Sequence, residues 1–160
     1  SECSELIEKF GGHPMAAGLT VTAENLPKLE EKLNRMTELR EEDLKVRVWI
    51  DSVLPLSYVS EKLVGDLEKM EPFGNGNARP VFAERNVHPA SFRVMGKNRN
   101  VLKMTLLSPD GTVLPAIMFG EADRLKKELE NRNTVNILYY PVINEWNGYR
   151  SLNIQVEEYQ

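Results

Sequence analysis

The sequence contains one cysteine, two histidines and no long apolar run among its 160 residues. The single cysteine, Cys3, cannot form an internal disulfide, and it fits a reducing compartment. No apolar stretch approaches the roughly 20 residues of a membrane helix. The amino-terminal end also lacks the basic and then apolar layout of a secretion signal. We therefore expect a cytoplasmic protein without membrane contact.

Candidate metal ligands are equally sparse. His13 and His88 lie far apart, and no run combines aspartate with histidines. Metal-assisted phosphodiester hydrolysis commonly needs several such ligands around two divalent ions. The sequence therefore predicts no metal site and no catalytic residues in this chain, which we expect to be inactive alone. The scattered carboxylates that lack ligand-like spacing include Asp51, Asp66, Asp110 and Asp123.

What the chain does have is the composition of a globular protein. Hydrophobic residues make up 41% of it and charged residues 28%, which argues against disorder. The net charge of −4 is divided unevenly. Residues 1–72 carry nine basic and fifteen acidic side chains, whereas residues 73–160 carry eleven basic and nine acidic ones. This asymmetry matters more than the total, because binding depends on the local potential.

The first half is predicted to be an α/β arrangement. We expect a helix over residues 2–9 that is joined in mid-course, as in a fragment of a longer chain, and then a strand over 19–21. Alternation predicts a strand over 45–51, and a helix over 57–71 is expected to form a bridge to the second half. A helix after residue 22 should bury its apolar stripe, which consists of Leu26, Leu29, Leu33 and Met36.

The second half is predicted to be rich in β-structure. Five strands with one helix between the third and fourth is the order of an OB-fold, a partly open barrel. A β-sandwich is the alternative, although it would not need the helix. The fold class is therefore α+β. The expected strands span 81–95, 101–107, 112–119, 134–143 and 149–157, the helix spans 121–131, and the marked turns are 96–100, 109–111 and 147–148.

Two hairpin ends of this barrel are candidates for nucleic-acid binding. The span 92–103 holds four cations and no acidic residue, and the span 144–150 holds two aromatic rings and a cation. We expect both ends to lie on the same side of the barrel, where cations beside aromatic rings suit a single strand. Exposed solubilising cations and a cross-strand aromatic pair are the alternative. The candidate residues are Phe92, Arg93, Lys97, Arg99, Lys103, Trp146, Tyr149 and Arg150.

A glycine-rich stretch forms a second candidate site. Gly11 and Gly12 can adopt positive φ and bring their N–H groups close to an anion. His13 follows directly and could donate to a phosphate oxygen. The alternative is a tight turn whose histidine satisfies a backbone carbonyl.

Two motifs carry a resemblance to a known family. The stretch 11–18, GGHPMAAG, resembles the signature of the DHH-associated domain of DHH phosphoesterases. The stretch 70–82, MEPFGNGNARPVF, resembles that of RecJ exonucleases, except that Ala78 stands where that pattern usually has proline. The resemblance implies the end of a partial α/β DHH-associated domain over 1–50, a connecting helix and turn over 51–80, and a five-stranded OB-fold over 81–160.

The same resemblance implies a function for the parent protein. It would be an exonuclease that depends on Mn²⁺ or Mg²⁺, bound by an absent upstream domain, and degrades single-stranded DNA from 5′ to 3′ in DNA repair and recombination. Gly11, Gly12 and His13 would help to seat the substrate phosphate. The expected partners are single-stranded DNA and a single-strand-binding protein or a helicase. Two alternatives remain open: another DHH-family phosphoesterase that acts on small nucleotides, and an OB-fold module that docks a protein.

Overall fold

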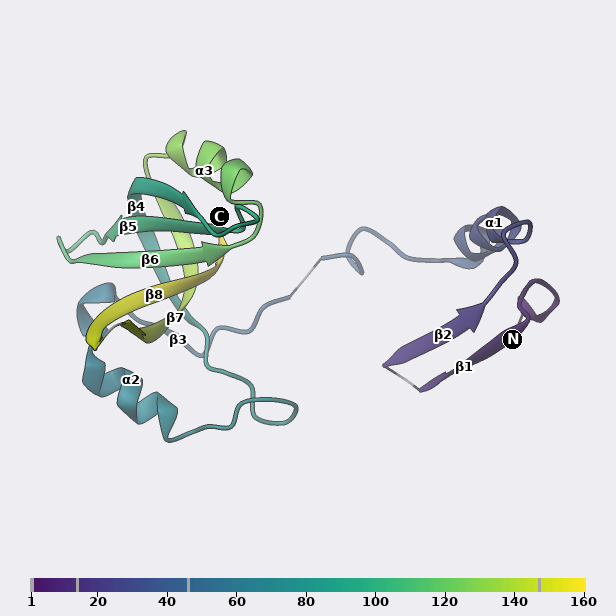
Figure 1. The fold of residues 1–160 in the computed structure, drawn as a ribbon, viewed down its shortest axis with the longest axis horizontal. Helices are drawn as coiled ribbons and strands as arrows, with labels where there is room; N and C mark the ends of the chain where they lie inside the picture. Colours follow the sequence, from purple (N-terminus) through teal and green to yellow (C-terminus); the bar gives the residue numbers. More distant parts are fainter. Residues whose placement is uncertain (1, 14, 46, 147) are drawn as a thin grey trace. The chain divides into compact units, whose positions relative to one another are not determined.

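The structure is a computed structural model that describes residues 2–13, 15–45, 47–146 and 148–160. The chain divides into two compact units, Ser1–Arg47 and Val48–Gln160 (Figure 1). Among the described residues, no helix is long and apolar enough to cross a membrane. The first unit contains a short 3₁₀ helix, a hairpin and one α-helix: η1 (Ser4–Leu6), β1 (Lys9–His13), β2 (Ala16–Thr20) and α1 (Leu26–Met36).

The start of the first unit differs from the prediction. The expected helix over 2–9 is wrong, because only Ser4–Leu6 is helical and β1 already begins at Lys9. The N–H of Glu8 already donates to the carbonyl of Thr20, and Lys9 pairs with Thr20 in β2, so the backbone is extended where the helix was expected to continue. The expected strand is confirmed with a shift, as Ala16–Thr20.

Helix α1 is confirmed, but its apolar stripe is not buried as expected. Leu29 is buried, with 3% of its surface exposed, whereas Leu26 and Leu33 are about half exposed, at 54% and 47%. The described part of this unit offers little to cover the stripe. One contact to it comes from Cys3, whose Sγ lies 3.9 Å from the Sδ of Met36.

The second unit follows the predicted order of strands and helices closely. Its one clear departure is the strand expected over 45–51. Only Ser52 and Val53 form a strand, and they pair in parallel with the start of β4; residue 46 lies outside the described part. The elements are β3 (Ser52–Val53), η2 (Leu56–Tyr58), α2 (Glu61–Glu68), β4 (Phe82–Met95), β5 (Val101–Leu107), β6 (Val113–Phe119), α3 (Ala122–Glu130), β7 (Val135–Trp146) and β8 (Tyr149–Tyr159).

Five strands of the second unit pair in a closed order. β4 pairs with β5, β5 with β6, β6 with β8, β8 with β7, and β7 returns to β4. All these pairings are antiparallel except that of β6 with β8. β4 serves two partners because it bends at two irregularities, where Asn86 and Ser91 have positive φ. Its first half pairs with β7 and its second half with β5.

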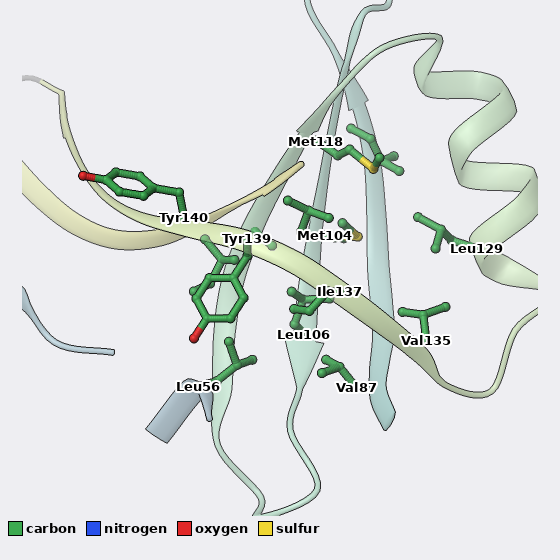
Figure 2. Packing of buried hydrophobic residues seen from close by; sticks show 14 of the residues in the cluster. Leu56, Val87, Met104, Leu106, Met118, Leu129, Val135, Ile137, Tyr139 and Tyr140 are labelled. Atoms are coloured by element: carbon green, nitrogen blue, oxygen red, sulfur yellow. The ribbon is translucent and has the colours of Figure 1, made fainter. Parts of the chain in front are cut away.

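The core of the second unit lies inside this ring of strands (Figure 2). Alternate residues of each strand point inward, as the pleat of a β-strand requires. Helix α3 adds Leu125 and Leu129 as expected. The segment before α2 adds Leu56, which is completely buried. The other fully buried side chains include Tyr139, Leu102, Leu106, Ile137 and Ile154.

One carboxylate is buried in this core. Glu84 is 7% exposed, and its side chain accepts a hydrogen bond from the N–H of Leu56 at 2.9 Å and another from the hydroxyl of Ser108. Nearby, the hydroxyl of Tyr139 donates to the carbonyl of Leu54 at 2.7 Å. These bonds fix the segment before α2 to β4, to β7 and to the turn after β5.

Replacing Glu84 with alanine should lower the free energy of unfolding by about 2–4 kcal/mol. Each buried donor left without a partner costs about 1–3 kcal/mol, and Glu84 serves two. The matched control is Glu158→Ala, at an exposed site, which should change stability by less than about 0.5 kcal/mol. Urea denaturation of both variants measures the difference. Equal losses would show that the Glu84 contacts contribute nothing specific.

The turn after β5 predicts an acid-dependent contribution to stability. Hydrogen bonds from the Ser57 hydroxyl and the Thr112 N–H lower the pKa of Asp110 to about 2. Since an unfolded aspartate titrates near about 3.9, this contribution is complete above about pH 4 and is lost as the pH falls towards 2. The variant Asp110→Asn should therefore be less stable than the parent chain at pH 5, and the difference should shrink towards pH 2. Thermal unfolding at several pH values tests this; a difference independent of pH would contradict it.

Candidate nucleic-acid interface

Arg93 and Lys103 lie together on the outward side of β4, β5 and β6, which we call the outer face. Arg93 is paired with Lys103 across β4 and β5, and Lys103 with Ile117 across β5 and β6. Both cations are exposed. Since residues two apart in a strand share a face, the neighbouring row on this face is Met95, Val101 and Phe119, which are also paired across the strands.

The outer face thus combines cations with an exposed aromatic ring. Phe119 is 55% exposed and Met95 is 41% exposed. Lys103 and Phe119 occupy diagonal positions on adjacent strands, where side chains lie about 7–8 Å apart. In the described part of the chain, neither Arg93 nor Lys103 lies within 4 Å of a carboxylate. Their charge is therefore available to a ligand.

The two other predicted cations, Lys97 and Arg99, both lie in the turn between β4 and β5, but their contacts differ. Lys97 is exposed at the turn. Arg99 instead donates two hydrogen bonds to the carboxylate of Asp123, at 2.6 and 2.5 Å, which raises the pKa of its guanidinium and lowers that of Asp123. Its carbonyl also accepts the N–H of Ala122. Arg99 therefore anchors the turn to the start of α3, and its guanidinium is already paired with a carboxylate.

The predicted aromatic residues differ in how far their rings are exposed, and the remaining cation, Arg150, lies near a carboxylate. Phe92 is half-buried and packs against the core, so it does not offer a free ring. Tyr149 is 81% exposed at the start of β8. Arg150 beside it lies 3.8 Å from the carboxylate of Glu61 at the start of α2. The side chain of Trp146 lies outside the described part of the structure.

The two hairpin ends do not lie together. Phe119 at the end of β6 is paired with Val101, so the β4–β5 turn lies near that end of β6. β6 runs parallel to β8, with Met118 opposite Val156, so the β4–β5 turn lies level with the end of β8. The β7–β8 turn lies at the other end of β8, before Tyr149. At about 3.3 Å per residue, the turns are separated by about 20 Å along β8. The prediction of adjacency is therefore wrong: one turn meets α3 and the other lies near α2 (Figure 1).

The glycine pair of the first unit forms part of a strand and not a turn. Gly11 pairs with Gly18, and Gly12 with Ala17, in the β1–β2 hairpin. Neither glycine has positive φ, so the expected anion cradle of left-handed glycines is wrong. A Cβ on Gly12 would lie 2.5 Å from the carbonyl oxygen of Ala16, so glycine is required there by close strand approach. His13 ends the strand exposed, and its Nδ1 accepts the N–H of Met15 at 3.2 Å.

Comparison with known proteins places this geometry in a family. A family model described as the RecJ OB domain matches residues 50–158, which covers β3 and nearly all of the closed ring of strands. The chain belongs to the RecJ OB domain family.

RecJ proteins resemble the chain over almost its whole length. The chain is 29% identical over 160 residues to the single-stranded-DNA-specific exonuclease RecJ of Bacillus subtilis. It is 32% identical over 161 residues to the RecJ of Haemophilus influenzae. These alignments include 99% and 98% of the chain, but only 20% and 28% of the two relatives. The chain therefore spans between a fifth and a third of the curated relatives that it matches.

Two solved RecJ structures share the fold. Both come from Thermus thermophilus and were solved in complex with Mn²⁺ and with Mg²⁺, with TM-scores of 0.66 and 0.63 and sequence identities of 19% and 20%. Each match includes 99% of this chain, and it covers 22% and 24% of the respective RecJ chain. At this identity the similarity establishes a common architecture.

The donor set of the described residues does not fit the Mn²⁺ or Mg²⁺ of those RecJ structures. Within residues 2–13, 15–45, 47–146 and 148–160, no three histidine, cysteine, aspartate or glutamate side chains are grouped to hold a metal ion. We therefore derive no chemical step through a metal on this part of the RecJ fold.

Phe119 was not among the aromatic rings predicted to bind nucleic acid. The strand 112–119 was expected, and alternation places residues 113, 115, 117 and 119 on one face. Which face is outward depends on the pairing of Ile117 with Lys103. This pairing between strands cannot be derived from the sequence of β6 alone.

The glycine pair of this RecJ-family chain offers a matched test of the hairpin. Gly12→Ala should disrupt β1–β2 because the new Cβ meets the backbone of Ala16 and Ala17 at 2.5 and 2.7 Å, whereas Gly11→Ala should be tolerated because nothing lies within 4 Å. Amide hydrogen exchange measures this, with faster exchange at the cross-strand N–H groups of the Gly12 variant alone. Equal protection in both variants would contradict the close approach.

Proposed function

We propose that this chain serves as the OB-containing segment of a RecJ-type exonuclease and that it binds single-stranded DNA. In this proposal residues 1–50 are the end of a DHH-associated domain, 51–80 connect it, and 81–160 form a five-stranded OB-fold barrel. The parent would be a Mn²⁺- or Mg²⁺-dependent hydrolase that degrades single-stranded DNA from 5′ to 3′ in DNA repair and recombination. The family match and the closed order of strand pairing support this assignment.

The observation that carries the proposal is the composition of the outer face. Lys103 lies diagonally opposite the exposed ring of Phe119, Arg93 is paired with Lys103 on its other side, and Lys97 lies at the turn that joins β4 to β5. Single-strand sites combine cations that follow the backbone with aromatic rings on which bases stack. Such a surface accepts any sequence, because every base has a flat face and every nucleotide a phosphate. This tolerance suits an enzyme that degrades a strand processively or completely.

Tyr149 and Arg150 form a second contact in this proposal. They lie about 20 Å along β8 from the level of the β4–β5 turn, so a strand would pass over the outer face before it reaches them. Arg150 is held near Glu61, which weakens its attraction for phosphate. We therefore assign the main electrostatic contribution to Arg93, Lys97 and Lys103.

His13 would contribute at the scissile phosphate in the parent enzyme. Its Nδ1 accepts a backbone N–H, which leaves Nε2 to carry the proton of the neutral ring. A donor aimed at a phosphate oxygen stabilises charge that develops there during hydrolysis. Gly12 supports this role indirectly, because it allows the close strand pairing that positions His13 at the end of β1.

Two substitutions on the outer face should weaken single-stranded DNA binding in distinguishable ways. Lys103→Gln should reduce the dependence of log K on log salt by about 0.7, because one phosphate contact is lost. Phe119→Ala should lower the affinity by roughly 5- to 100-fold, because stacking contributes about 1–3 kcal/mol per base, and should leave the salt dependence unchanged. Fluorescence anisotropy with a labelled oligothymidine at several salt concentrations measures both quantities.

Matched controls come from the same unit. Lys127→Gln removes an exposed cation of α3, and Tyr58→Ala removes an aromatic ring that is 69% exposed. Neither residue belongs to the outer face, so neither variant should change the binding. If Phe119→Ala bound the oligonucleotide as well as Tyr58→Ala does, the outer face would not be the binding site.

A further inference from the structure

The loop that carries the 70–82 motif forms one wall of a groove outside the outer face. The groove encloses about 540 Å³ between α2, this loop and β7, a size typical of binding pockets. The ring of Phe73 meets that of Tyr140 edge-on at 6.3 Å, and both contribute to the lining. The hydroxyl of Tyr140 has no hydrogen-bond partner in the described part and is not sealed off from solvent. Figure 2 shows the rings of Tyr139 and Tyr140 leaving β7 in different directions.

The loop is preorganised by its own hydrogen bonds. The side-chain amide of Asn77 donates to the carbonyls of Met70 and Pro72 at 2.9 and 3.0 Å. The backbones of Gly74 and Asn77 exchange two further bonds, at 2.8 and 3.1 Å. A wall held in this way loses little conformational entropy when a ligand binds.

The free charges of the groove are negative. The carboxylates of Glu68 and Glu71 line it, and neither has a hydrogen-bond or ion-pair partner among the described residues. The one cation of the lining, Arg79, is already engaged: it forms an ion pair with Glu157 and stacks 4.6 Å above the ring of Tyr140. A phosphate would therefore be repelled, whereas a cationic side chain would be attracted.

The third wall of the groove is a strand with an open edge. β4 pairs with β7 only as far as Tyr139, so from there to the end of β7 the one strand partner among the described residues is β8. In an antiparallel pair, alternate residues direct their N–H and C=O groups away from the partner. The two-residue hairpin pairs Trp146 with Tyr149, which directs the groups of Ile143 and Glu145 away from β8. Ile143 also lines the groove.

We propose that this groove and the open edge of β7 bind an extended peptide segment of a partner protein in which basic residues alternate with apolar ones. The peptide would add a strand beside Ile143 and Glu145, the mode in which backbone bonds supply affinity and pockets for alternate side chains supply specificity. Its apolar side chains would contact Phe73 and Ile143, which line the groove and are half-buried. Its cations would pair with Glu68 and Glu71. The inference does not depend on DNA binding.

The probe is a fluorescein-labelled hexapeptide in which arginine alternates with valine, and the comparison peptide carries glutamate in place of arginine. Anisotropy with the 160-residue chain should detect the arginine peptide and not the glutamate peptide. The double variant Glu68→Gln/Glu71→Gln should bind the arginine peptide about tenfold more weakly. The control variant Glu41→Gln/Glu42→Gln, at two exposed sites of the first unit, should bind it unchanged. Equal binding by both variants, or tighter binding of the glutamate peptide, would overturn the proposal.

Amide chemical shifts of the labelled chain locate the peptide independently of any variant. The largest changes should fall on Ile143, Glu145 and Gly74. An oligothymidine, titrated in a separate sample without the peptide, should instead shift residues of the outer face; the two are not mixed because the cationic peptide would itself bind the polyanion. Peptide-induced changes centred on Lys103 and Phe119 would overturn the groove as its site. Failure of the oligonucleotide to bind at all would count against the proposed function alone.

Discussion

The geometry of the second unit depends on the bending of one strand, β4. Its first half must pair with β7 and its second half with β5, and a straight strand cannot do both within a closed ring. The bends occur at Asn86 and Ser91, whose φ values of 59° and 56° lie in the left-handed region. Each costs on the order of 1–2 kcal/mol for a residue with a Cβ, so the surrounding pairings must stabilise them. Because of these bends, β4 points Glu84 into the core and Arg93 to the outside.

The positions of the two ends of β4 also explain why the second unit has two chemically different surfaces. At its end, β4 places Arg93 and Met95 beside β5 and so completes the outer face. At its start, Phe82 is the first residue that pairs with β7. The rest of β7 is left with one strand partner, and the loop that leads into β4 fills part of the space beside it. A cationic sheet surface and an acidic groove thus follow from the two ends of one strand.

The sequence predicts the elements of the second unit well because their signals are local. Alternating residues and Asp-Gly or Asn-Gly turns mark a strand or a hairpin within about ten positions. The failures concern partners that lie far away in the chain. Residues 45–51 have the alternation of a strand, but the ladder with β4 forms only at Ser52 and Val53. Arg99 looks like a free cation until Asp123 is found beside it. The hairpin ends look adjacent until the parallel pairing of β6 with β8 sends one to each end.

An acidic chain can offer a site to a polyanion only if its charges are kept apart. The closed order of the strands achieves this separation. β5 lies at the centre of the outer face, with β4 and β6 as its neighbours, whereas β7 is one of the two strands in the ring that do not touch β5. Charges in water are screened within about 8–10 Å at physiological ionic strength, and neighbouring strands are spaced by about 4.8 Å. The carboxylates beside β7 therefore act on their own groove and contribute little to the potential over Lys103. Residues 48–160 carry thirteen basic and fourteen acidic side chains, so the near-neutral total of the second unit averages two surfaces that a ligand meets one at a time.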